Sequence, residues 1–410
     1  QLSFPKTPPN NPPAYHTMAR SHQQPSNKNE KHSILPQPNY APLNVPLKRR
    51  LQTLAVLIWC SMMSICIFLF FFICSIPILF WLPIIIYLTW ILIWDKAPEN
   101  GGRSISWVRN SKAWKLFADY FPAKLIKKAH LLIRAPTHLT SRKQIWIQRK
   151  PISLGECEKG HDWLDPRVFG ASANKSLDSY HPHGIISMGS FITFATNATG
   201  FNESFPGIKP SLLTLTSNFN IPFYRDYMMA CGLCSVSKTS CQNILTKGGP
   251  GRAIAIVVGG ASESLSARPG VMDLVLKRRF GFVKIAVQTG ASLVPTLSFG
   301  ENDLYEQVEN DENSRLRRWQ KKVQHALGFT MPLFHGRGVF NYDFGLLPHR
   351  HPIHTVVGKP IPVPKDAKDR PMDAVVNELH EKYMDALQDM YDRYKDVYAK
   401  DRIKELEFVE

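Results

Sequence analysis

The chain has 410 residues, with 50 Lys and Arg against 33 Asp and Glu, a formal net charge of +17 and a 44% hydrophobic composition. This length predicts one or two compact units with additional segments. The charge favours an anionic partner such as nucleic acid, an anionic membrane surface or a phosphorylated substrate. Because no long Lys/Arg block is interleaved with aromatic residues, we expect no nucleic-acid binding.

The first segment, residues 1–47, is rich in Pro, Asn, Ser and Gln and poor in aromatic residues. A chain of this composition cannot bury enough apolar surface to offset the conformational entropy that folding removes. We therefore predict a disordered, proline-rich N-terminal tail.

Residues 51–94 contain no charged side chain. This stretch is about twice the twenty or so residues that a helix needs to cross the hydrocarbon core of a bilayer. Pro77 and Pro83 lie near its middle, where proline breaks or kinks a helix. The sequence therefore predicts a transmembrane helical hairpin. Its bounds are residues 48–96, with helices over about 54–75 and 78–94.

Basic residues flank the apolar stretch on both sides, and they include Lys48, Arg49, Arg50, Lys96, Arg103, Lys112 and Lys115. Because positive flanks stay on the cytosolic side of a membrane, a hairpin that returns to the cytosol satisfies both of them. A re-entrant hairpin that never fully crosses the bilayer is the alternative. Either arrangement embeds the chain in a membrane.

The rest of the chain alternates short apolar runs with helix-length segments, which is typical of an α/β fold with a mixed sheet flanked by helices. We predict this domain over residues 97–365 and an amphipathic helix, packed on the domain, over residues 366–410. Basic and apolar residues around 124–132 suit a helix, either at the membrane surface or in the core. The predicted strands are 212–215, 252–258, 282–287 and 293–297, and the predicted helices between them are 227–234 and 241–246.

Tyr180-His181-Pro182-His183-Gly184 follows a polar, loop-like run at residues 172–179. Proline fixes its own φ and biases the preceding residue towards extended geometry, while glycine allows a sharp turn or a close approach to a ligand. An imidazole held there could take a proton from a hydroxyl near neutral pH. The alternative is a surface turn with two hydrogen-bonded histidines.

A glycine-rich turn, Gly259-Gly260-Ala261-Ser262-Glu263, follows the most apolar predicted strand. Open α/β sheets place their ligands at the carboxyl ends of strands, so Glu263 is expected at such an end. A carboxylate in that place could orient an imidazole and stabilise its protonated form. The alternative is a surface acid or a helix N-cap.

Several short motifs in this order resemble the type-2 diacylglycerol O-acyltransferase family, which includes monoacylglycerol acyltransferases and wax synthases. The resemblance covers roughly residues 105–365 and the paired apolar helices before them. The matching elements are Tyr120-Phe-Pro122, His181-Pro-His-Gly184, Phe205-Pro-Gly207, Pro222-Phe-Tyr-Arg-Asp226, Gly259-Gly-Ala-Ser-Glu263, Arg279-Phe-Gly-Phe282, Val294-Pro295, Phe299-Gly-Glu-Asn302, Gly336-Arg-Gly338 and Val357-Gly-Lys-Pro-Ile361.

The resemblance implies transfer of a fatty acyl group from acyl-CoA to diacylglycerol, giving triacylglycerol, by a fold similar to that of the glycerolipid acyltransferases. An alcohol becomes a competent nucleophile when a base removes its proton as it attacks. We assign that role to His183, ahead of His181, because Gly184 leaves space beside it, and we expect Glu263 to orient the imidazole. Because a thiolate leaves readily, we expect no metal and no cofactor beyond acyl-CoA as co-substrate.

Glycerolipid acyltransferases with an HxxxxD motif take the orienting acid from five residues after the histidine. Here those positions hold Ile186 and Met188, which cannot orient an imidazole, so the acid must come from elsewhere in the chain. For substrate contacts we predict the backbone of Pro182, Gly184, Gly259 and Gly260, and for the anionic coenzyme the cations Arg225, Lys238, Lys277, Arg278 and Arg279. Each cation is alternatively a solvated or headgroup-facing charge.

The resemblance further implies an endoplasmic reticulum membrane protein with a cytosolic catalytic domain, with lipid droplets as a second location. The acceptor stays open between diacylglycerol, monoacylglycerol, a fatty alcohol and a lysophospholipid, and so does the formation of a homo-oligomer. A catalytically silent lipid-binding protein is the alternative from another class. The intact histidine and glycine-glycine motifs argue against that alternative.

Overall fold

The computed structural model describes residues 39–42, 44–76, 81–127, 175–307, 314–315, 318–320, 322–323 and 332–409. Nearly all of the predicted tail, the bend at 77–80 and the stretch 128–174 lie outside these ranges.

The apolar segment forms two helices, α1 (Leu47–Ser75) and α2 (Trp81–Thr89), and α2 continues into the π-helical turn η1 (Trp90–Trp94). The first helix begins at Leu47 instead of near residue 54. Within the described part of the chain, α1 alone is long and apolar enough to cross a membrane. α2 has 9 residues, too few for a crossing by itself. The path of the pair through a bilayer stays a prediction.

The N-terminal half of α1 is fixed to the α/β domain. Arg350 donates hydrogen bonds to Gln52 Oε1 at 2.8 Å and to Thr53 Oγ1 at 3.0 Å. About two turns further on, the Trp59 ring lies 5.5 Å from the ring of Phe117. The helix thus begins as part of the domain before its exposed apolar half leaves it.

Phe223 joins the two apolar helices to the domain. Its ring lies 5.5 Å from Tyr87 of α2, in stacked geometry, and 6.2 Å from Phe70 of α1. Its backbone N–H donates to Tyr87 Oη at 3.0 Å, and that hydroxyl donates to Asp226 Oδ2 at 2.5 Å. Phe223 has a φ of 62°, a strained conformation for a bulky residue.

The described residues form a central sheet of seven strands in the order β1-β10-β7-β2-β5-β3-β4. β10 is antiparallel to β7, and all other neighbouring pairs are parallel. The predicted mixed sheet flanked by helices is confirmed. The strands are β1 (Lys124–Lys127), β2 (Ser176–His181), β3 (Lys209–Thr214), β4 (Leu233–Ser235), β5 (Arg252–Val257), β7 (Ser292–Phe299) and β10 (His354–Val357). Two small pairs, β6 (Asp273–Val275) with β11 (Glu407–Val409) and β8 (Glu306–Gln307) with β9 (Phe334–His335), lie outside it.

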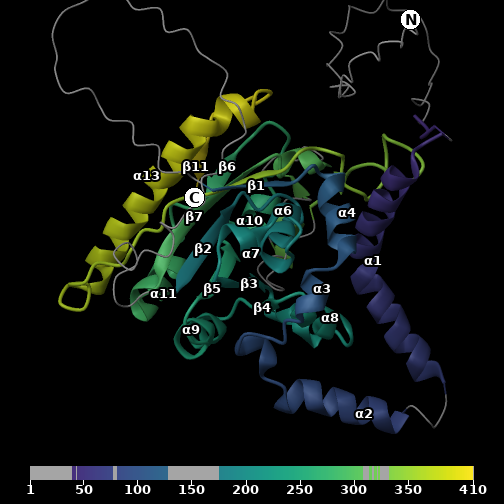
Figure 1. The fold of residues 1–410 in the computed structure, drawn as a ribbon, viewed down its shortest axis with the longest axis horizontal. Coiled ribbons are helices and arrows are strands. Elements are labelled where there is room, and N and C mark those ends of the chain that lie inside the picture. The colour runs from purple at the N-terminus through teal and green to yellow at the C-terminus, as the bar shows by residue number, and fades with distance from the viewer. Residues whose placement is uncertain are drawn as a thin grey trace, which may run out of the picture. The chain divides into compact units, whose positions relative to one another are not determined.

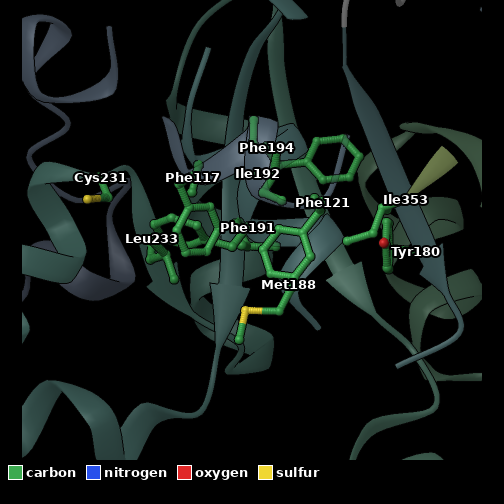
Figure 2. Close-up of a cluster of buried hydrophobic side chains, with 14 of the residues drawn as sticks. Phe117, Phe121, Tyr180, Met188, Phe191, Ile192, Phe194, Cys231, Leu233 and Ile353 are labelled. Carbon is green, nitrogen blue, oxygen red and sulfur yellow. The ribbon is translucent and has the colours of Figure 1, made fainter. Parts of the chain in front are cut away.

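Each face of the sheet carries its own hydrophobic core. One face packs against α9 (Lys238–Lys247), α11 (Gly281–Thr289) and the long α13 (Met372–Tyr398), as Figure 1 shows. The other face carries an aromatic cluster that includes Phe117, Phe121, Tyr180, Phe191 and Phe194 (Figure 2). Its helical elements are α4 (Lys112–Tyr120), α6 (Met188–Ser190), η4 (Phe191–Ala195), α7 (Phe201–Ser204) and α8 (Tyr224–Ala230).

One predicted strand, residues 282–287, is wrong because this segment lies within α11. Its β-branched and aromatic composition is typical of a strand, but Phe282, Val283 and Ala286 are buried on one side at helical spacing. Gly290, with a φ of 69°, ends the helix in the left-handed conformation that glycine favours. Spacing of the buried residues therefore outweighs composition here.

Other boundaries also differ from the predictions. The polar run predicted as loop contributes most of β2, and residues 124–127 form β1 instead of a helix. The predicted helix 227–234 ends at Ala230, and its last residues enter β4. The strands predicted at 212–215, 252–258 and 293–297 and the helix at 241–246 are confirmed. The amphipathic C-terminal helix packs on the domain as predicted, but it spans Met372–Tyr398 instead of residues 366–410, and residues 407–409 form β11.

Candidate active site

Three adjacent parallel strands bring the site together. β2 lies between β7 and β5, and its last residue, His181, begins the turn His181-Pro-His-Gly184. β5 leads into α10 (Gly260–Ser264), which carries Glu263, and β7 leads into Glu301. Because ligands of α/β sheets bind at the carboxyl ends of parallel strands, the histidine turn and both acids occupy a ligand-binding edge.

His181 is fully buried, with 0% exposure, on the face covered by α13. Its Nε2 lies 3.1 Å from Tyr383 Oη, and that hydroxyl donates to the Ser179 carbonyl at 3.1 Å. Since the tyrosine proton is used in this way, Nε2–H of His181 donates to the hydroxyl oxygen. These contacts tie the end of β2 to α13.

His183 is half-buried, and its ring is held by its own neighbour. Nδ1 lies 3.0 Å from the Gly184 carbonyl oxygen. A carbonyl only accepts, so Nδ1 carries the proton and Nε2 carries the lone pair. Burial lowers the pKa of His183, against the opposing effects of the Gly184 carbonyl and the Glu263 charge. The neutral ring with a free Nε2 is the form of a general base.

The Glu263 carboxylate lies closer to the backbone of the histidine turn than to the imidazole rings. Its Oε2 accepts the His183 backbone N–H at 2.7 Å, and its Oε1 accepts the Val275 N–H at 2.9 Å. Its Oε1 lies 3.9 Å from His181 Nδ1, beyond hydrogen-bond distance. A Cβ at Gly259 would overlap the Glu263 carboxylate, so this turn requires glycine. The Glu263 carboxylate therefore contacts His183 at the His183 backbone N–H.

The family profile described as diacylglycerol acyltransferase matches residues 71–137 and 171–409. Diacylglycerol O-acyltransferase 2A of Umbelopsis ramanniana is 70% identical over 385 residues, which cover 93% of this chain and 97% of that protein. The chain belongs to the diacylglycerol acyltransferase family. No solved structure matches it.

Two more distant relatives have names that specify different acyl acceptors. Diacylglycerol O-acyltransferase 2 of Dictyostelium discoideum is 46% identical, over 88% of this chain and 96% of that protein. 2-Acylglycerol O-acyltransferase 1 of Bos taurus is 42% identical, also over 88% of this chain and 96% of that protein. Both kinds of acyltransferase thus align with nearly the whole chain.

The cations predicted for the coenzyme fall into two groups in this family member. Arg225 is 1% exposed and forms a 2.8 Å ion pair with Asp95, so it stabilises the junction between the apolar segment and α8. Arg279 Nη2 lies 3.4 Å from the Gly259 carbonyl and 3.3 Å from Ser262 Oγ, beside the turn that carries Glu263. Lys238, Lys277, Arg278 and Arg279 are exposed.

A cavity of about 80 Å³ lies beside the histidine turn, lined in part by Pro182, Glu301, His351, Tyr391 and Arg402. The sequence motifs did not single out Glu301 as a functional residue, although an acid directly after a strand that neighbours β2 is the signal that could have done so. Among the described residues, no group of three or more His, Cys, Asp or Glu side chains could hold a metal ion.

Proposed function

We propose that this protein is a diacylglycerol O-acyltransferase that transfers a fatty acyl group from acyl-CoA to diacylglycerol and forms triacylglycerol. The observation that carries the proposal is the 70% identity to diacylglycerol O-acyltransferase 2A across 97% of that relative. The half-buried, neutral His183 supports it, because the proposed reaction needs a base beside a lipid alcohol.

In the proposed mechanism, His183 Nε2 accepts the proton of the free hydroxyl as the hydroxyl oxygen attacks the thioester carbonyl. A tetrahedral intermediate forms, and backbone N–H groups near Gly184 would stabilise its oxyanion. The C–S bond then breaks, the ester stays with the glycerol, and the coenzyme A thiolate takes the proton from the His183 imidazolium. Thiolates leave readily, so this chemistry requires no metal and no cofactor besides acyl-CoA.

Glu263 would support the base in two ways. Its hydrogen bond to the His183 N–H supports the turn in one position, and its negative charge favours the imidazolium that forms when the proton is taken. This differs from direct orientation of the ring by a carboxylate. His181 would act only through the position of β2, because its contacts join β2 to α13.

Four exposed cations would bind the phosphates of the coenzyme, and one of them, Arg279, lies beside the Glu263 turn. Lys277, Arg278 and Arg279 follow β6 in an exposed run, and Lys238 opens α9. Charged hydrogen bonds to phosphate are the strong ones, whereas Arg225 is already paired with Asp95. The glycines Gly259 and Gly260, together with Pro182 and Gly184, would let the thioester approach the backbone.

We further propose that the apolar helices α1 and α2 anchor the protein in the endoplasmic reticulum membrane as a hairpin, with the catalytic domain in the cytosol and lipid droplets as a second location. Exposed large apolar side chains along both helices support a lipid environment. The basic residues on both flanks support the cytosolic placement of both ends. The sheet with helices on both faces is in keeping with a glycerolipid-acyltransferase-like fold.

A second acceptor is supported by one observation. The bovine relative, 42% identical over most of both chains, is named a 2-acylglycerol O-acyltransferase, so monoacylglycerol is the competing substrate. Purified protein would be given equal amounts of diacylglycerol and monoacylglycerol with radiolabelled acyl-CoA. We expect the triacylglycerol product to dominate, and dominant diacylglycerol product would favour the second acceptor.

The decisive variant is His183→Ala. We expect acyl transfer to fall by at least about a hundredfold, because general-base catalysis contributes about 10²–10⁴, with an unchanged amount of folded, membrane-bound protein. The matched control is His335→Ala on the small strand β9, which should retain parental activity. Parental activity in folded His183→Ala would refute the assignment.

The pH profile gives a second readout of the same group. Because burial lowers the pKa of His183 from 6.5, the neutral base persists below the pH at which a free imidazole is half-protonated. Activity should therefore fall as pH decreases through a value below about 6.5. An acid limb above that pH in the parent enzyme would contradict a desolvated His183 as the base.

A further inference from the structure

Glu301 is a second buried carboxylate at the histidine turn. It comes two residues after the end of β7 and is 2% exposed. β2 lies between β7 and β5, and β5 leads to Glu263. The turn is therefore flanked by one acid from each neighbouring strand.

The contacts of Glu301 hold the segment that follows the histidines. Its Oε2 accepts the Gly189 backbone N–H at 2.9 Å and the Tyr180 hydroxyl at 2.7 Å. Figure 2 shows Tyr180 beside Ile353 at the edge of the aromatic cluster. One carboxylate oxygen thus joins the strand before the turn to the helix after it.

The side chain of Glu301 also lies against Gly184. A Cβ at Gly184 would come within 2.8 Å of Glu301 Cγ, and Gly184 has a φ of 61°. Both the space and the backbone conformation require glycine. The Glu301 side chain therefore packs directly against Gly184.

The position of that peptide matters because the Gly184 carbonyl holds His183 Nδ1 at 3.0 Å. This hydrogen bond fixes both the orientation of the ring and the nitrogen that carries the lone pair. A shift of Gly184 would rotate the ring, and catalysis is sensitive to misplacement of about 1 Å.

We propose that Glu301 is a positioning residue that holds Gly184 and Gly189 so that His183 Nε2 faces the lipid hydroxyl, an inference that rests on the acyltransferase function proposed above. Glu263 accepts the His183 N–H from the β5 side, and Glu301 accepts the Gly189 N–H from the β7 side. Neither acid touches the catalytic ring by a hydrogen bond.

The geometry predicts that the Oε2 atom of Glu301, as a hydrogen-bond acceptor, positions the turn, and that the negative charge of the carboxylate is not needed. Both donors bind Oε2, so an amide oxygen in the same place could accept both. Burial raises the pKa of Glu301 to about 7, which indicates that the site accommodates an uncharged side chain. Glutamine should therefore replace Glu301, whereas aspartate, one methylene shorter, should not reach.

The test compares Glu301→Ala, Glu301→Gln and Glu301→Asp in the full-length, membrane-purified protein, with initial rates over a range of acyl-CoA and diacylglycerol concentrations. We expect alanine to lower kcat at least about tenfold with both KM values within about threefold of the parent. Aspartate should give an intermediate kcat, and glutamine should stay within about threefold of the parent.

Asp178 provides a matched control. It lies on the same strand and face as Tyr180, is 5% exposed, accepts a hydrogen bond from Ser176 Oγ at 3.1 Å and has a pKa raised by burial to about 7. Asp178→Asn should leave kcat per folded molecule within about twofold. If Glu301→Ala does not accumulate as folded protein, the Asp and Gln variants carry the test.

Three results would overturn the inference: parental kcat in folded Glu301→Ala, parental kcat in Glu301→Asp, or a loss in Glu301→Gln as large as in the most impaired folded variant. Failure of the proposed function would look different. In that case the parent protein itself would not acylate diacylglycerol from acyl-CoA.

Discussion

The two longest helices in the described part of the chain, α1 with 29 residues and α13 with 27, are similar in length and opposite in character. α1 carries no charged residue after Arg50 and buries three side chains, whereas α13 buries eight along one side and carries charges on the other. A helix that is apolar all round needs an apolar environment, and a helix with one apolar stripe needs a core. Length alone therefore distinguishes neither role, but the distribution of charge does.

The largest difference should appear when charge is placed on the exposed apolar half of α1. Replacing Phe68, Phe71 and Phe72, each more than half exposed, by lysine should cost about 2.5–3.5 kcal/mol per residue in a hydrocarbon core. We expect the variant to be extracted from membranes by alkaline carbonate. The control is Val397→Lys on α13, 57% exposed, which should remain in the membrane fraction. Equal extraction of both would contradict a lipid environment for α1.

The next largest effect should come from a substitution that creates a cavity beneath α13 and so lowers the free energy of unfolding. Leu387 is 0% exposed, so Leu387→Ala should lower the free energy of unfolding by about 2–5 kcal/mol. The matched change Phe71→Ala on α1, at a side chain 64% exposed, removes little protein packing and should cost well under half as much. Thermal unfolding of both variants in the same detergent measures the difference, and similar losses would contradict the different packing of the two helices.

The smallest effect should come from the charged side of α13. Lys382 and Glu378 form an (i, i+4) ion pair at 2.6 Å, and Lys382 is 55% exposed. Glu378 keeps its second partner, Arg370, when Lys382 is removed. Lys382→Ala should therefore change the free energy of unfolding by less than about 0.5 kcal/mol. A loss above about 1 kcal/mol in the same unfolding assay would indicate that this pair supports the core.

The same contrast explains how much of the fold could be predicted from the sequence. α13 was predictable because Leu379, Tyr383 and Leu387 recur at helical spacing among charges. β2 was not, because its Ser176, Asp178 and Ser179 resemble a loop by composition. Ser176 Oγ donates to Asp178 within the strand, and Tyr383 donates to the Ser179 carbonyl from α13. A sequence does not show such contacts.

The candidate site also has a part that could be predicted from the sequence and a part that could not. The histidine and glycine-glycine motifs predicted two neighbouring turns, and the structure brings both to one edge of the sheet. The roles of the acids depend on register, because β2 pairs with β7 as well as with β5, which brings Glu301 to the turn. No spacing along the chain gives that pairing, since 120 residues separate His181 from Glu301.

Phe223 gives the anchor a definite geometry. Its ring contacts one aromatic side chain from each apolar helix, and the hydrogen bonds of Tyr87 join the second helix to the same loop. The α/β domain is therefore joined to both apolar helices at one loop by ring contacts and hydrogen bonds, and not only through the connecting chain. With both helices in a membrane, as proposed above, this joint would fix the orientation of the domain to the bilayer, so acceptor molecules would reach the histidine turn from one side.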